Sequence, residues 1–127
     1  MATIKSFTSL EQSKVLAKIL PLESADMYYH PYPNDEDWYD IPNFGKANVK
    51  YNQLPCWSLA ALLEHLRKID LFPDIIDAVD CVLMDISFAD DEDGKVLHSV
   101  HCLRVEGKTI LDACVEMIIV LHSKNLL

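Results

Sequence analysis

The residues best able to do chemistry in this 127-residue chain are its five histidines and four cysteines, three of which gather at His98, His101 and Cys102. Zinc sites are typically built from Cys-x₂₋₄-Cys or His-x₃₋₅-His pairs, and this segment offers neither. Because consecutive strand residues point to opposite faces, His98 and Cys102 would share a face but His101 would not. A Cys–His nucleophile would also need a base and an oxyanion hole, which no local motif supplies. We therefore predict no metal site, no cofactor and no catalytic residue.

The acidic turn at residues 90–94 has the composition of a calcium loop but not its spacing. When Gly94 takes the sixth position of an EF-hand loop, Ala89 occupies the first position and Val100 the twelfth, where carboxylates are required. A solvated hairpin turn, in which Gly94 supplies a positive φ, is the better interpretation. The glycines at 45, 94 and 107 are too scattered to form a phosphate-binding loop.

Residues 21–57 are the part of the sequence that says most about function. They hold eight of the eleven aromatic residues, and six acids against two lysines give them a charge of −4. Tyr and Trp are enriched at interface hot spots, whereas a long segment with poor apolar periodicity is also typical of a lid. Both interpretations, a surface for a protein partner and a lid that completes the core, stay open. The candidate interaction residues are Tyr28, Tyr29, Tyr32, Trp38, Tyr39, Phe44 and Trp57.

The formal net charge of −9 excludes several classes of function. Binding to nucleic acid by neutralising phosphates needs clustered Lys and Arg, and docking on anionic membranes needs them too. No stretch approaches the ~18 consecutive apolar residues of a membrane-spanning helix, and no apolar signal core opens the sequence. We expect a cytoplasmic protein whose cysteines are free thiols.

Three helices are expected to form the framework. Thr8 and Glu11 have the spacing of a capping box, and Pro21 ends the helix that follows. Ser58 and Thr109 are expected to cap the other two helices. The last helix is apolar nearly all round, which indicates burial on more than one side, against the sheet or another chain. The predicted helices span residues 9–20, 58–69 and 109–123.

An antiparallel hairpin over about residues 81–105 is expected to form a small sheet. Apolar and polar residues alternate from Cys81 to Ala89, which predicts the first strand, and Val96 to Val105 is expected to form the returning strand. The inward face of the returning strand has two alternatives, namely Leu97, His101, Leu103 and Val105, or Val96, Val100 and Cys102. Residues 74–79 are compatible with a helical turn or a loop. Short strands are expected around Met27–Tyr29 and Val49–Tyr51, and residues 1–7 are a frayed start or an edge strand. The prediction is a single α+β domain over residues 1–127.

Two helix-opening segments carry a resemblance to known proteins. They read Pro55-Cys56-Trp57-Ser58-Leu59-x-Ala61-Leu62-Leu63 and Gly107-x-Thr109-x-x-Asp112-Ala113-x-Val115-Glu116-Met117-Ile118. Their pairing resembles small uncharacterised proteins of gut Bacteroides and their phages or mobile elements. The order of elements is similar to a phage-type α-β-α sandwich domain. The resemblance implies a phage- or mobile-element-related protein with a layered fold, and it carries over no functional residue.

The function that these observations favour is non-enzymatic protein–protein interaction, with a protein partner or with a second copy of the chain. An alternative is an acidic inhibitor or nucleic-acid mimic that binds the basic groove of a partner. It requires one connected surface formed by Asp35, Glu36, Asp37, Asp40, Asp90, Asp91, Glu92 and Asp93. A small enzyme of unknown type is the third hypothesis.

Overall fold

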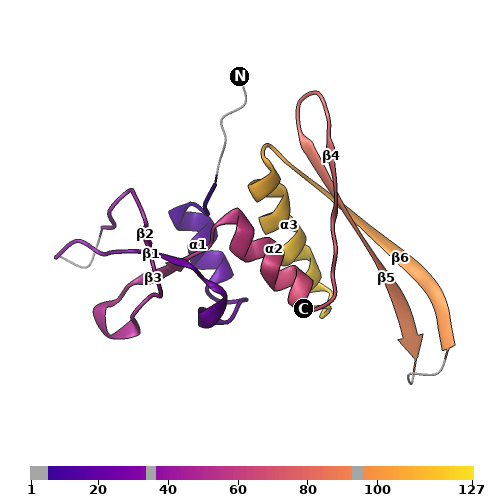
Figure 1. Cartoon of the computed structure of the whole chain (residues 1–127), viewed down its shortest axis with the longest axis horizontal. Helices are drawn as coiled ribbons and strands as arrows, with labels where there is room; N and C mark the ends of the chain where they lie inside the picture. Colours follow the sequence, from indigo (N-terminus) through magenta and orange to yellow (C-terminus); the bar gives the residue numbers. More distant parts are fainter. Residues whose placement is uncertain (1–5, 34–36, 93–95) are drawn as a thin grey trace.

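The structure, a computed structural model, describes residues 6–33, 37–92 and 96–127. Within these residues three α-helices and two three-stranded antiparallel sheets confirm the predicted α+β fold. The helices lie between the two sheets along the long axis of the molecule (Figure 1). The helices are α1 (Leu10–Leu16), α2 (Leu59–Lys68) and α3 (Ile110–Ser123). The strands are β1 (Met27–Tyr29), β2 (Asn43–Phe44), β3 (Leu54–Cys56), β4 (Asp74–Asp77), β5 (Val82–Glu92) and β6 (Val96–Gly107).

Helix α1 differs from the prediction at both ends. The capping box is formed by Ser9 and Gln12, whose backbone N–H groups donate to each other's side chains at 3.1 and 3.0 Å. The predicted pair, Thr8 and Glu11, is wrong because the buried Thr8 hydroxyl bonds to the Trp57 N–H and the Ser13 hydroxyl. The predicted range 9–20 is also too long, since the chain passes into turns after Leu16.

Helices α2 and α3 begin at the predicted caps. The Ser58 hydroxyl accepts from the Ala61 N–H, and the Thr109 hydroxyl accepts from the Asp112 N–H, both at 3.1 Å. Helix α3 contacts β5 and β6 as well as α1 and α2, so its apolar circumference is covered largely by its own chain. The buried face of α3 contains Leu111, Ala113, Cys114, Val115, Met117, Ile118 and Leu121.

The larger sheet has the strand order β4-β5-β6 and contains the predicted hairpin, in which β5 runs to Glu92 and β6 to Gly107, past the predicted ends at Ala89 and Val105. Residues 74–77, predicted as helical turn or loop, form the edge strand β4 instead, because they pair with residues 82–85. On β6, Val105 is buried and Leu103 half-buried while Cys102 is exposed, so these residues follow the first alternative for the inward face.

The smaller sheet has the order β2-β1-β3. The predicted strand at Met27–Tyr29 is confirmed, but Val49–Tyr51 forms a 3-10 helix, η2, and the predicted strand there is wrong. The reason is local: the Asn48 side chain accepts from the Lys50 N–H at 3.0 Å, and Asn52 ends the turn with a φ of 54°. Asn is one of the few residues that adopts this left-handed conformation at low cost.

Candidate functional site

The seven predicted interaction residues divide into two groups. Tyr29 and Trp57 are buried and Tyr28 and Trp38 half-buried, whereas Tyr32, Tyr39 and Phe44 are exposed. Trp38 packs against the cluster of Met27, Tyr29 and Cys56 beneath the smaller sheet. The aromatic segment therefore covers part of the core with one group, as the lid interpretation predicts, and presents the other group to solvent, where the partner-surface interpretation stays a prediction.

A buried group of hydroxyls fastens the covering part of the segment to α1. The Trp57 N–H donates to the Thr8 hydroxyl at 3.1 Å, and the Tyr29 hydroxyl donates to the Thr8 carbonyl at 2.7 Å. The Thr8 and Ser13 hydroxyls are 2.8 Å apart. Burial raises the pKa of Tyr29 above its usual value, so this phenol stays protonated and remains a donor.

The start of the smaller sheet is also fixed to its surroundings. The Asp26 carboxylate accepts from both the N–H and the hydroxyl of Ser58, which places a negative charge at the N-terminus of α2. The Lys46 ammonium donates to the carbonyls of Glu23 and Ala25 at 2.6 and 2.8 Å. These contacts hold the base from which the exposed aromatic residues project.

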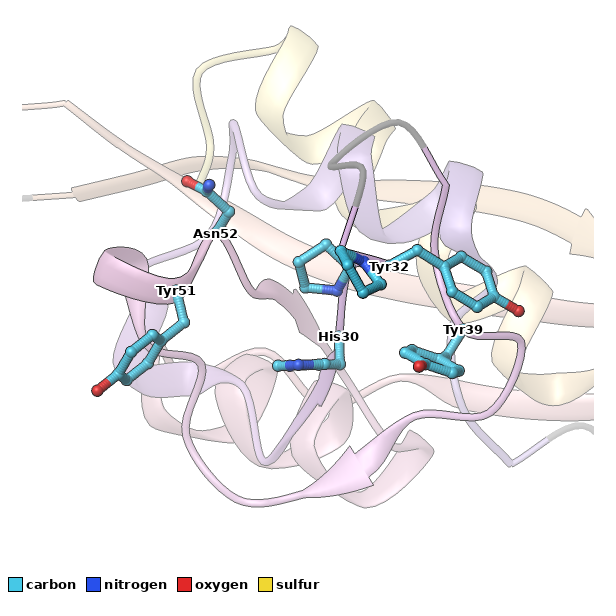
Figure 2. Close-up of a pocket in the computed structure, with 7 residues that line it drawn as sticks. His30, Tyr32, Tyr39, Tyr51 and Asn52 are labelled. Atoms are coloured by element: carbon cyan, nitrogen blue, oxygen red, sulfur yellow. The ribbon is translucent and has the colours of Figure 1, made fainter.

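Three exposed rings, those of His30, Tyr32 and Tyr39, form a ring cluster on this base, in which Tyr39 contacts the other two. The Tyr32 and Tyr39 ring centroids are 4.2 Å apart, and the His30 and Tyr39 rings are stacked with centroids 6.1 Å apart (Figure 2). The ring cluster is positioned by an antiparallel bridge between Pro31 and Trp38. On either side of that bridge, the Tyr39 N–H donates to the His30 carbonyl at 3.0 Å and the Tyr32 N–H donates to the Asp37 carbonyl at 2.8 Å.

Two hollows share the three rings. One, of about 320 Å³, is also lined by Tyr51 and Asn52, which lie across from the rings in Figure 2. The other, of about 530 Å³, is also lined by Asp40, Ile41 and Asn43. We call the residues His30, Tyr32, Tyr39, Ile41 and Tyr51, which line these hollows, the aromatic surface.

Two large apolar side chains in this part of the chain are highly exposed. Ile41, which belongs to the aromatic surface, is 77% exposed, and Phe44, which follows the hollow-lining residue Asn43 on β2, is 83% exposed. Exposed apolar groups that gather in this way are typical of interaction sites. His30, Ile41 and Tyr51 were not among the predicted residues. Tyr51 lies in the aromatic-rich segment 21–57, so the aromatic composition of that segment could have placed it among the candidate residues.

The four cysteines are free thiols, as predicted. Burial raises the pKa of Cys114 to about 12 and that of Cys56 above its usual value, so neither thiol forms a thiolate near neutral pH. Cys102 is exposed on β6. Among the residues that the structure describes, no group of three His, Cys, Asp or Glu side chains is placed to hold a metal ion.

The described acidic residues of the mimic hypothesis do not lie together. Asp37 and Asp40 are beside the smaller sheet, whereas β5 carries the second acidic run to Glu92 at the opposite end of the molecule (Figure 1). Asp35, Glu36 and Asp93 lie outside the described residues. This placement gives no support to one connected acidic surface.

No helix in the described ranges is both long and apolar enough to cross a membrane. Comparison of the chain with protein-family models, with curated proteins and with solved structures gave no match. The resemblance to phage and mobile-element proteins therefore stays a prediction, and the functional argument depends on the geometry of the surface itself.

Proposed function

We propose that this chain is a non-enzymatic interaction protein and that its aromatic surface docks a protein partner. The observation that carries the proposal is the exposed ring cluster of His30, Tyr39 and Tyr32, which lines two hollows. Rings already held by stacking lose little conformational freedom on binding, so they give contact area at low entropic cost. Tyrosine is also among the residues most enriched at binding hot spots.

The charge around the aromatic surface favours a basic or amphipathic partner. Asp40 lines the larger hollow, and Asp37 lies next to the bridge that positions the rings. Tyrosine faces attract cations through their ring quadrupole, and Arg does so most often in proteins. A partner segment that inserts an Arg or Lys side chain between the rings and Asp40 would satisfy both contacts.

The proposal is tested by capture from an extract of the native host, followed by mass spectrometry. The bait proteins are the wild-type chain, the double variant Tyr32→Ala/Tyr39→Ala and a control, Val15→Ala, which truncates an exposed side chain on α1. We expect a partner that wild type and control recover equally and that the double variant recovers at least about tenfold less, since hot-spot truncations commonly cost more than about 1.4 kcal/mol. Equal recovery by all three proteins would contradict the proposal.

Sedimentation equilibrium separates a foreign partner from self-association. A concentration-dependent dimer that forms in the wild-type chain and in Val15→Ala, but is lost in Tyr32→Ala/Tyr39→Ala, would identify a second copy as the partner. Circular dichroism of each variant checks that its fold is retained.

A further inference from the structure

Strand β4 forms one edge of the larger sheet, on the far side of the helices from the aromatic surface (Figure 1). It pairs only with β5, in a register that runs from Asp74 opposite Asp85 to Asp77 opposite Val82. Among the described residues no strand pairs with its other side. Alternate residues of such a strand direct backbone N–H and C=O groups outward, and this is a template for a further strand.

The two central side chains of β4 are apolar and exposed. Ile75 and Ile76 are 42% and 41% exposed, although they point to opposite faces of the sheet. Phe72 and Val79 flank them and are 65% and 99% exposed. An added strand would therefore find apolar side chains on both faces.

The charges on β4 differ in sign from those on the other edge strand, β6. In its described part, β6 exposes one charge of each sign, Arg104 and Glu106, whereas the two charged residues of β4 are both acidic. Arg104 binds Asp85 through two hydrogen bonds of 2.7 and 2.8 Å, so that carboxylate on the central strand is already neutralised.

The negative charge around β4 favours a basic partner strand. Residues 69–80 contain Asp70, Asp74, Asp77 and Asp80 and no Lys or Arg. Asp74 and Asp77, which begin and end the strand, are exposed, and neither forms an ion pair with a described residue. Opposite charges facing each other across a strand pair stabilise it, and like charges destabilise it.

A second copy of the chain is a poor occupant for this reason. Two β4 strands that pair antiparallel over all four residues place Asp74 of each copy opposite Asp77 of the other. The net charge of −9 on each copy adds to this repulsion.

We propose that β4 binds an extended cationic segment of a partner protein by antiparallel strand addition. The segment carries Lys or Arg opposite Asp74 and Asp77 and two apolar residues opposite Ile75 and Ile76. Backbone hydrogen bonds give affinity, and the alternating apolar and charged contacts give specificity. The site is independent of the aromatic surface, so either one can fail while the other stands.

The probe is a fluorescent capped peptide whose central residues are lysine, valine, isoleucine and lysine, titrated with the full chain and followed by fluorescence anisotropy. One control peptide is N-methylated at alternate central residues, which blocks strand pairing but keeps the charge. The variant Asp74→Asn/Asp77→Asn removes two charges at the edge. Its matched control, Glu11→Gln/Glu116→Gln, removes two exposed charges elsewhere.

We expect saturable binding of the probe, a loss of roughly fivefold in affinity for Asp74→Asn/Asp77→Asn, and a loss of less than about twofold for the control variant. The N-methylated peptide should not bind, and one of the amides of Ile75 and Ile76 should gain protection from hydrogen exchange when the probe binds. Absence of saturable binding at millimolar probe, or equal binding of the N-methylated peptide, would overturn the proposal. If the free chain forms a dimer that the variant Ile76→Lys dissociates, the edge binds a second copy of the chain, and this result would also overturn the proposal.

Discussion

Replacement of Thr8 by valine tests whether the buried hydroxyl group holds the aromatic segment on the helices. Valine has nearly the shape of threonine, so the change removes hydrogen bonds without opening a cavity. The Thr8 side chain is fully buried, and its hydroxyl accepts from the Trp57 N–H at 3.1 Å and lies 2.8 Å from the Ser13 hydroxyl. Thr8→Val removes both of these contacts, together with a weak hydrogen bond of 3.4 Å that the Thr8 hydroxyl donates to the Cys56 Sγ.

The expected loss follows from these two contacts. A buried backbone N–H without an acceptor costs about 1–3 kcal/mol, and the Ser13 hydroxyl adds about 1 kcal/mol. The unfolding free energy should therefore fall by about 2–4 kcal/mol, which for a chain of this size lowers the midpoint of thermal unfolding by about 10 °C. The companion variant Ser13→Ala removes the same hydroxyl pair, so the double variant should be less destabilised than the sum by about 1 kcal/mol.

Urea unfolding followed by tryptophan fluorescence measures the effect, because Trp57 is buried beside the changed residue. The control is Ser123→Ala, which removes an exposed hydroxyl that donates to the Val120 carbonyl at 2.7 Å and should change stability by less than about 0.5 kcal/mol. The reasoning is refuted if Thr8→Val is no more destabilising than Ser123→Ala, or if its effect adds fully to that of Ser13→Ala.

Three further predictions concern the core and its thiols. Gly107→Ala should lower the unfolding free energy by about 3 kcal/mol or more in urea titrations, because a Cβ there would lie 2.3 Å from the Ala113 nitrogen; unchanged stability would contradict this contact. In the native protein a thiol reagent should modify Cys102 quickly and Cys56 and Cys114 only after unfolding is induced, as peptide mapping would show. Burial raises the pKa of Cys114 to about 12, whereas the unfolded thiol has a pKa of about 8.5. The folded chain therefore loses stability as pH rises from about 8.5 toward 12, because over this range the thiol ionises only in the unfolded chain. Urea unfolding of Cys114→Ala should accordingly show a smaller loss of stability than wild type between about pH 9 and about pH 11, and equal losses would contradict the prediction.

The parts of the fold that sequence predicted are those set by local chemistry. Ser58 and Thr109 cap helices because each is followed by an apolar periodic run, and the hairpin follows from strict alternation. The start of helix α1 was misplaced by one residue because Thr8 and Ser9 are both suitable caps. The choice between them is made by Trp57 and Ser13, which are distant or buried partners that no local pattern reveals.

The division of the aromatic residues could be predicted only in part. Tyr28 and Tyr29 are neighbours in a strand, so one had to face inward if the strand formed. Which of them is buried depends on the pairing of β1 with β3 and on the Thr8 carbonyl that receives the Tyr29 hydroxyl. Strand β4 was missed because Asp-Ile-Ile-Asp has no alternation, and its pairing with β5 alone makes it a strand.

The acidic residues of the chain can serve solubility or the recognition of a partner. Substitutions at β4 and at the aromatic surface distinguish these two roles. Acidic residues that serve only solubility are interchangeable, so removing Asp74 and Asp77 should then affect binding no more than removing Glu11 and Glu116. At β4, however, the carboxylates sit at both ends of an exposed apolar pair, where their spacing matches a cationic strand residue by residue. Position-dependent loss of affinity would thus assign these charges to recognition, and binding at β4 should weaken with added salt because the contacts are exposed. The same comparison with Asp40→Asn applies to the aromatic surface, because Asp40 lines the larger hollow together with the three rings.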